Sequence, residues 1–301
     1  MKKFITRVVL FILLIAACDY AIGRGGEYAF NSSKSGINRK LKEIRDTSVP
    51  DIVIFGSSRA EHHYVTDILA ESTGSGTYNM GIDGNGILLM YPYLSQLLTR
   101  HTPDVVIYDI LPSYDLYDDN HEQYLKYLTS LHGLPEADSI MYEIAPAQRF
   151  KLYSHIYPFN SQYPSLVKGA LSSVDSYSHG YILICGRLPE DNQRTILSGS
   201  PYSRLKLNIL NRFISLCDKN DIRLIMTVSP FYGEFCPDDI EYISALCERN
   251  GIQFMDFSRH PDFISSPELF ADTYHLNSEG AELFTRILAD SIAQPHTTHG
   301  M

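Results

Sequence analysis

The stretch that most constrains this chain runs from Asp51 to His63. An apolar run with β-branched and aromatic side chains stops abruptly at Gly56, and Ser57 and Ser58 follow before a polar segment that can open a helix. The pattern predicts a buried strand, a tight turn and a helix N-terminus. Open α/β sheets bind ligands at the carboxyl ends of their strands, and helix amides there favour negative charge. Either serine is therefore a candidate nucleophile or an ordinary N-cap of the helix.

From Asp51 onward, short apolar segments alternate with amphipathic ones, which is typical of α/β folds. The third strand is a continuous apolar run between Pro103 and Pro112, as expected for a strand buried on both faces. The sequence predicts a three-layer α/β/α domain with a flavodoxin-like, doubly wound parallel sheet of about five strands. The predicted strands are 52–55, 77–80, 104–111, 223–228 and 253–256, and the helices are 58–71, 87–100, 203–219, 240–249 and 279–292.

Shifts in composition divide the rest of the chain. Residues 24–50 are rich in Gly, Ser and charge, and they predict a flexible spacer with one short polar helix. Residues 113–200, rich in Tyr, Ser, His and Pro, interrupt the alternation and predict an insertion after the third strand that caps one end of the sheet. We therefore expect a domain at 51–293 and a flexible tail at 294–301.

Residues 1–23 have the outline of an export signal. Lys2, Lys3 and Arg7 precede the apolar run from Val8 to Cys18, and Asp19 follows it. The run is shorter than the roughly 20 residues that cross a bilayer, and its length suits the apolar region of a signal peptide. We expect the bulk of the protein outside the cytoplasm, in the cell envelope.

The segment Ile15-Ala16-Ala17-Cys18 resembles the cleavage box of bacterial lipoproteins, which makes Cys18 a candidate for lipidation. An uncleaved amino-terminal anchor and simple secretion are the alternatives. No pair among the other cysteines has metal-ligand spacing. Cys217 and Cys247 lie on apolar faces of predicted helices and are expected to be buried as small hydrophobic residues.

The formal net charge of −10 argues against a nucleic-acid partner, because phosphate binding depends on clustered Lys and Arg. The sequence makes no prediction of oligomeric state.

One acidic and one basic side chain near the carboxyl end of the chain have a spacing suited to ester chemistry. Asp272 and His275 lie three residues apart on a loop before the last helix, so the carboxylate can reach one imidazole nitrogen while the other nitrogen faces the cleft. Gly84, in the turn after the second strand, offers a backbone N–H that could form part of an oxyanion hole with the N–H of Ser58.

Three segments together resemble blocks one, two and five of the SGNH (GDSL-type) hydrolase superfamily, over roughly residues 51–293. They are Gly56-Ser57-Ser58-Arg59, Asn79 to Gly84, and Asp272-Thr273-Tyr274-His275-Leu276-Asn277. The resemblance implies that Ser58 is the nucleophile, Asp272 the orienting acid, His275 the base and Gly84 an oxyanion donor. It implies no metal and no cofactor.

The chain departs from the superfamily pattern in two places. Ser57 stands where an Asp often precedes the nucleophile, a change seen in the branch of exported or membrane-attached relatives that act on cell-surface polysaccharides. The third strand carries Asp109-Ile110-Leu111 in place of the block Gly-x-Asn-Asp, so the third oxyanion donor is missing. Losing one donor typically costs about 10²- to 10³-fold in rate. Asn85 and Asn79 are candidates for oxyanion or substrate binding.

His62 and His63 are expected to be polar residues at the rim of the cleft, because adjacent helical residues point in different directions and do not share a metal ion.

The expected function is that of a serine esterase or O-acyltransferase, with acetyl as the expected acyl group. Its expected partners are an acylated carbohydrate of the cell envelope and, through the amino terminus, the membrane. The alternative is a non-catalytic SGNH-like module that binds glycans or assists envelope assembly.

Overall fold

The computed structural model describes residues 1–34, 36–47, 49–119, 121–160, 162–172, 179–189 and 192–293. The chain divides into two compact units. We call residues 1–46 with 120–175 the anchor unit, and residues 47–119 with 176–301 the sheet unit. The predicted insertion at 113–200 is thus shared between the two units. The predicted tail at 294–301 lies outside the described residues.

The sheet unit contains a five-stranded parallel sheet with the strand order β2-β1-β3-β5-β7. This confirms the predicted number of strands and their parallel direction. The order steps outward in both directions from β1, so the sheet is doubly wound. The strands are β1 (Ile52–Gly56), β2 (Thr77–Asn79), β3 (Val105–Asp109), β5 (Arg223–Val228) and β7 (Gln253–Asp256).

Side chains of β1, β3 and β5 stand in register and form rows across the sheet. One row belongs to the apolar core that includes Phe284. The alternate row packs on the other face, where the rings of Phe55 and Tyr108 each lie edge-on to the ring of Phe213. Both rows are fully buried, as the near-continuous apolar sequence of these strands requires. The rows are Ile54, Ile107 and Ile225 on the first face and Phe55, Tyr108 and Met226 on the second.

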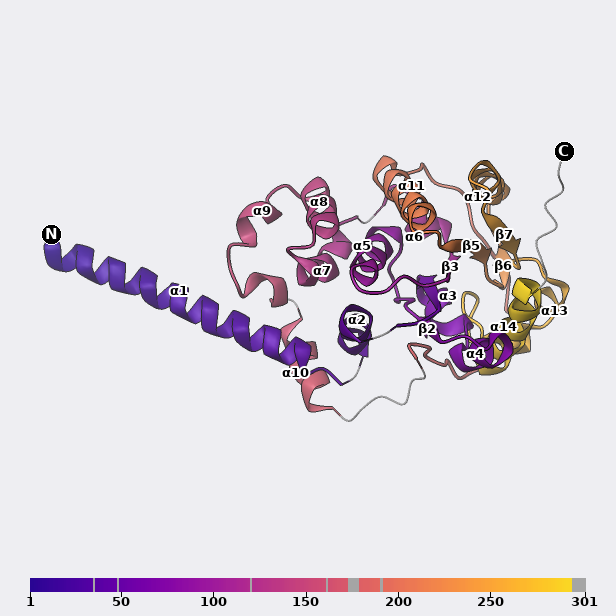
Figure 1. The fold of residues 1–301 in the computed structure, drawn as a ribbon, viewed down its shortest axis with the longest axis horizontal. Helices are drawn as coiled ribbons and strands as arrows, with labels where there is room; N and C mark the ends of the chain where they lie inside the picture. Colours follow the sequence, from indigo (N-terminus) through magenta and orange to yellow (C-terminus); the bar gives the residue numbers. More distant parts are fainter. Residues whose placement is uncertain are drawn as a thin grey trace. The chain divides into compact units, whose positions relative to one another are not determined.

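Helices cover both faces of the sheet (Figure 1), which confirms the predicted three layers. The face with Phe213 is covered by α5 (Ile87–Leu98), α11 (Arg204–Lys219) and α12 (Pro237–Arg249), and the other by α3 (Ser58–His63), α4 (Thr66–Thr73) and α14 (Ser278–Ala293). Short elements connect them: α6 (Pro112–Asp115), α13 (Pro261–Ile264), η4 (Pro267–Leu269) and a small parallel pair, β4 (Thr195–Ile196) with β6 (Gly233–Glu234).

The single helix predicted at 58–71 is in fact two helices, α3 and α4. The break is held by the hydroxyl of Thr285 on α14, which accepts a hydrogen bond from the N–H of Val65 at 2.9 Å and lies 3.1 Å from the carbonyl oxygen of His63. A tertiary contact from the far end of the sequence therefore ends the first helix.

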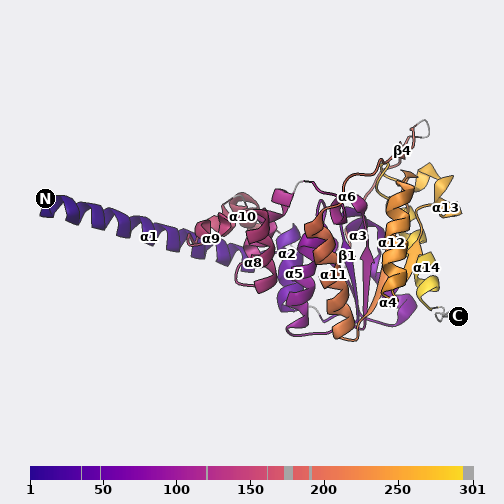
Figure 2. The same ribbon diagram turned by 90° about the horizontal axis from the view of Figure 1, so that it is seen from above.

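The anchor unit is helical in its described part. Figure 2 shows α10 beside the carboxyl-terminal part of α1, while the rest of α1 projects beyond it. The elements are α1 (Lys2–Asn31), α2 (Gly36–Asp46), η1 (His121–Tyr124), α7 (Leu125–Leu128), η2 (Thr129–Leu131), α8 (Pro135–Ile144), α9 (Gln148–Lys151), η3 (Tyr157–Phe159) and α10 (Tyr163–Leu171).

The amino-terminal helix is longer than the sequence predicts. α1 has 30 residues, and its most apolar window has a mean hydropathy of 2.1. By length and composition it can cross a bilayer, although a signal sequence has the same properties. Residues 24–31, predicted as part of a flexible spacer, belong to this helix, because Gly23 and Gly26 let α1 pack closely against His155 and Phe159.

Gly56 yields a prediction about stability. Its φ of +145° is in a region that disfavours side chains, and a Cβ there would lie 2.6 Å from the carbonyl oxygen of Asp109 on β3. The Gly56→Ala variant should lose roughly 3 kcal/mol or more of unfolding free energy. The control is Gly74→Ala, where φ is +69° but the space is open, and the cost should be about 1 kcal/mol. Equal losses in urea denaturation of the two purified variants would contradict the close approach of β1 to β3.

Candidate active site

Ser58 lies at the carboxyl end of β1, as the first residue of α3. Gly56, with φ of +145°, turns the chain sharply away from the strand. Ser57 is the N-cap residue of α3, but its side chain makes no capping hydrogen bond. The side chain of Ser58 is 7% exposed, whereas the Ser57 hydroxyl is buried with no hydrogen-bond partner among the described residues. Of the two candidate serines, Ser58 is the one with a reactive neighbour.

That neighbour is His275, on the loop before α14. The Oγ of Ser58 lies 2.8 Å from His275 Nε2, and His275 Nδ1 lies 2.9 Å from Oδ2 of Asp272. Because a carboxylate only accepts hydrogen bonds, Nδ1 carries the proton and Nε2 accepts the hydroxyl of Ser58. The structure thus brings together three residues that the sequence analysis selected.

The Asp272 carboxylate is held by its own loop. Its Oδ1 accepts hydrogen bonds from the N–H groups of Tyr274 at 2.7 Å and His275 at 2.9 Å. Burial raises the pKa of the Asp272 carboxyl, but the hydrogen bond and charge of His275 and these two amides outweigh burial and set the pKa below its usual value. Asp272 is therefore ionised at neutral pH and orients the imidazole.

Gly84 lies in the turn after β2, with φ of +67° and open space around its Cα. Among the described residues, neither the N–H of Gly84 nor the N–H of Ser58 donates to another group, and a first-turn amide such as that of Ser58 has no partner inside its helix. The turn is tied to α3, because the N–H of Asp83 donates to Glu61 Oε2 at 3.0 Å. Two backbone donors are thus available at this end of the sheet.

Asn79 offers no free amide hydrogen at this site, whereas Asn85 keeps one amide hydrogen without a partner among the described residues. Asn79 donates from Nδ2 to the carbonyl oxygens of Ala60 and Tyr64, at 2.7 and 3.1 Å, so both of its amide hydrogens are used in holding α3 to β2. Asn85 donates from Nδ2 to the carbonyl of Asp83 at 2.8 Å, and its buried Oδ1 has no partner among the described residues. Asn79 has a structural role, which corrects its assignment to oxyanion or substrate binding.

The two histidines after Ser58 have different surroundings. His62 Nδ1 lies 2.7 Å from the carbonyl oxygen of Ile182, and its ring stands edge-on to His275 with centroids 5.7 Å apart. Burial lowers the pKa of His62. His63 is completely buried, so its predicted position at the rim of a cleft is wrong.

His63 fixes the segment that carries His275. Its Nε2 accepts a hydrogen bond from the N–H of Leu276 at 3.0 Å, so the ring proton is on Nδ1, which donates to the Oγ of Ser229 at 2.9 Å. Burial and then the charge of Arg59 lower the pKa of His63 well below its ordinary value, which keeps the ring neutral.

Ser229 connects this histidine to a buried ion pair. Its Oγ accepts from Arg59 Nε at 3.0 Å and lies 3.0 Å from Asp109 Oδ2, and its N–H donates to Asp109 Oδ1 at 2.8 Å. Arg59 and Asp109 approach to 3.7 Å and both are buried. The Asp109 carboxylate is thus engaged with Arg59 and Ser229. We call Arg59, His63, Asp109 and Ser229 the buried polar network.

The sequence does not predict this network as a unit. One signal was present, since Asp109 is an ionisable residue inside an apolar strand and such a residue needs a buried partner. Nothing in the sequence identified Ser229 or Arg59 as that partner.

The described residues contain no group of three or more His, Cys, Asp or Glu side chains that could hold a metal ion. Cys217 and Cys247 are buried as predicted, and burial raises the pKa of each thiol to about 12.

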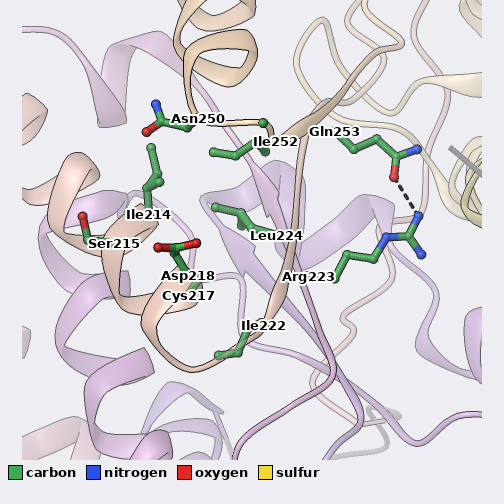
Figure 3. Close-up of a pocket in the computed structure, with 11 residues that line it drawn as sticks. Ile214, Ser215, Cys217, Asp218, Ile222, Arg223, Leu224, Asn250, Ile252 and Gln253 are labelled. Carbon is green, nitrogen blue, oxygen red and sulfur yellow. Dashed lines mark hydrogen bonds between the residues drawn. The ribbon is translucent and has the colours of Figure 1, made fainter. Parts of the chain in front are cut away.

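A cavity of about 330 Å³ lies at the opposite end of the sheet (Figure 3). Its wall includes Arg223 and Gln253, which begin β5 and β7 and are joined by a hydrogen bond of 2.7 Å. Ser58, in contrast, follows the last residue of β1. This cavity is therefore separate from the candidate active site.

Comparison with known proteins gives structural similarity only. No protein-family model matches the chain, and no curated protein matches it. Among solved structures, a GDSL-like lipase from Bacteroides thetaiotaomicron VPI-5482 has a TM-score of 0.41 at 12% identity, covering 85% of this chain and 98% of the lipase. The acetyl xylan esterase AlAXEase has a TM-score of 0.38 at 14% identity, covering 80% of this chain and 97% of the esterase.

The neutral, buried His63 predicts a dependence of stability on pH. Unfolded histidine takes up a proton near pH 6.5, whereas folded His63 does so only at much lower pH, so the unfolded state gains protons first as pH falls. This residue should therefore remove up to about 1.4 kcal/mol of unfolding free energy per pH unit below about 6.5.

The His63→Gln variant should unfold more easily at neutral pH but lose less additional stability on acidification than the parent. Urea denaturation at neutral and mildly acidic pH measures the difference. His179→Gln is the control, because the side chain of His179 is 68% exposed. An unchanged pH dependence in His63→Gln would show that His63 has the same pKa in the folded and unfolded states, which would contradict its neutral, buried state.

Proposed function

We propose that this protein is a serine esterase or O-acyltransferase that uses Ser58, His275 and Asp272. The supporting observation is the continuous hydrogen-bonded chain from Ser58 Oγ through the imidazole to the carboxylate, with distances of 2.8 and 2.9 Å. Each group has the partner that its role requires. The low pKa of Asp272 supports its role as an ionised orienting group.

In the first half of the reaction, Ser58 Oγ attacks the carbonyl carbon of the ester while His275 Nε2 takes the hydroxyl proton. Asp272 stabilises the imidazolium that forms. The negative oxygen of the tetrahedral intermediate is stabilised by the backbone N–H groups of Ser58 and Gly84. His275 then gives its proton to the leaving alcohol, and the acyl group stays on Ser58.

In the second half, His275 removes a proton from the acceptor, which attacks the acyl-serine and restores the free enzyme. Water as the acceptor makes the protein an esterase, and a sugar hydroxyl makes it an acyltransferase. We propose an acetylated carbohydrate of the cell envelope as the substrate. The basic residues Lys2, Lys3 and Arg7 at the start of α1 support a cytoplasmic amino terminus, with the sheet unit outside.

A second candidate function is a non-catalytic module that binds glycans or assists envelope assembly. One observation favours it: the third strand supplies Asp109, which is bonded to Ser229, and the amide hydrogens of Asn79 are engaged. A third oxyanion donor is therefore absent from the third strand and from Asn79, and of the two asparagines only Asn85 keeps an amide hydrogen without a partner among the described residues. This loss is worth about 2.7 to 4 kcal/mol in an active enzyme, which slows catalysis without abolishing it.

A fluorophosphonate probe separates the two functions, because it reacts covalently with an activated serine. The full-length protein should be labelled, and Ser58→Ala should abolish labelling. Ser57→Ala is the matched control and should keep it, because the Ser57 hydroxyl has no partner among the described residues. Absence of labelling in folded protein, together with no turnover of p-nitrophenyl acetate, would favour the binding module.

The role of Asp272 can be measured separately. Asp272→Asn should lower kcat for p-nitrophenyl acetate by about 10⁴-fold with little change in KM, because the amide favours the wrong imidazole tautomer. Thermal unfolding checks that the variant is folded. A decrease of less than about tenfold would rule out the orienting role.

A further inference from the structure

Within the anchor unit, one face of the carboxyl-terminal part of α1 packs against the other helices and loops. Asp19, Gly23, Gly26 and Phe30 follow the spacing of successive turns, and the last three are buried. Gly23 packs against His155, and Gly26 lies where a Cβ would be 2.7 Å from the ring of Phe159. The residues before Asp19 are all exposed. These contacts therefore fix the position of the apolar part of α1 relative to the other helices of the anchor unit.

Asp19 marks the boundary between these two parts of the helix. Its carboxylate accepts hydrogen bonds from the hydroxyl of Ser154 and from the N–H groups of His155 at 2.8 Å and Ile156 at 3.3 Å. A carboxylate does not enter the hydrocarbon core of a bilayer. If α1 is inserted, the core must end before Asp19, and the loop at 154–156 must lie at the membrane surface.

The segment just before that loop lies near the same boundary. Contacts with α1 move toward its carboxyl end as the loop proceeds, from Asp19 at Ser154 to Gly26 at Phe159. The residues that precede Ser154 are within a few residues of this boundary, and in both Figure 1 and Figure 2 α9 lies nearer than α8 and α10 to the side from which α1 projects. Two large aromatic side chains there are exposed, Phe150 at 75% and Tyr153 at 82%.

We propose that Phe150 and Tyr153 insert into the outer interface of the lipid bilayer that α1 enters. Aromatic side chains are enriched at that depth. Arg149 and Lys151, both exposed, flank Phe150 and suit anionic headgroups. A lipidated Cys18 would place the membrane surface at the same depth along α1, because its acyl chains would begin one residue before Asp19. The bilayer thus contacts the insertion as well as the amino-terminal helix.

The absence of tryptophan from the sequence makes the test direct, since one substitution introduces a single fluorophore. The full-length Phe150→Trp and Tyr153→Trp variants are reconstituted in vesicles of phosphatidylcholine and phosphatidylglycerol, with or without brominated acyl chains. The control is Leu171→Trp, at a position that is also 82% exposed in the anchor unit. The N–H of Lys34 donates to the carbonyl of Gly169, which places this control near the far end of α1, about 18 Å along the helix from Asp19.

The proposal predicts that brominated lipid quenches the variants at 150 and 153, that their emission shifts to shorter wavelength, and that acrylamide quenches them less than Leu171→Trp. Equal acrylamide quenching of all three variants, with no effect of bromine, would overturn it. Protection from acrylamide without quenching by brominated lipid would also overturn it and would indicate a protein partner, such as a second copy of this chain. Circular dichroism of each variant verifies the helical content.

Discussion

The buried ion pair between Arg59 and Asp109 is the constraint on which the rest of the site depends. A guanidinium that is 1% exposed requires a compensating charge and acceptors for its donors. Asp109 supplies the charge and Ser229 accepts from Nε and Nη2 of Arg59, whereas Nη1 has no hydrogen-bond partner among the described residues. Burial, and then the charge of this cation, keep the nearby His63 neutral by lowering its pKa. Arg59 directly follows Ser58, and His63 binds the residue directly after His275. Both proposed reactive side chains are thus one residue away from the same network, which joins α3, β3, β5 and the loop before α14.

The sheet was predictable because burial on both faces leaves a strong imprint on sequence. Apolar runs ending at Gly56 and bounded by Pro103 and Pro112 identified β1 and β3, and amphipathic periodicity identified the helices that cover them. The break between α3 and α4 was not predictable, because it is stabilised by Thr285 on α14 and no residue near the break in sequence indicates it. The continuation of α1 through Gly23 and Gly26 was also not predictable from the sequence. Glycines favour flexible segments unless other side chains pack closely against them, as His155 and Phe159 do here.

The pairing of Ser58 with His275 was predicted from ordered motifs, and their atoms lie within hydrogen-bond distance although the residues are far apart in the chain. The supporting residues were harder to predict. Asn79 has the residue type of an oxyanion donor, but its hydrogens are used by Ala60 and Tyr64. A side chain's type suggests a chemistry, and only its neighbours determine whether its polar atoms remain free.

The contacts between Asp19 and the loop at 154–156 have a consequence for removal of the amino-terminal segment. All of the buried contacts that α1 makes begin at or after Asp19, and the residues before it are exposed. A peptidase that cut the chain before Cys18 would remove only residues outside the packed interior. The segment from Asp19 to Asn31 would remain bound to the loop at 154–156 and to η3. The folded unit would therefore be the same with α1 intact and after cleavage before Cys18.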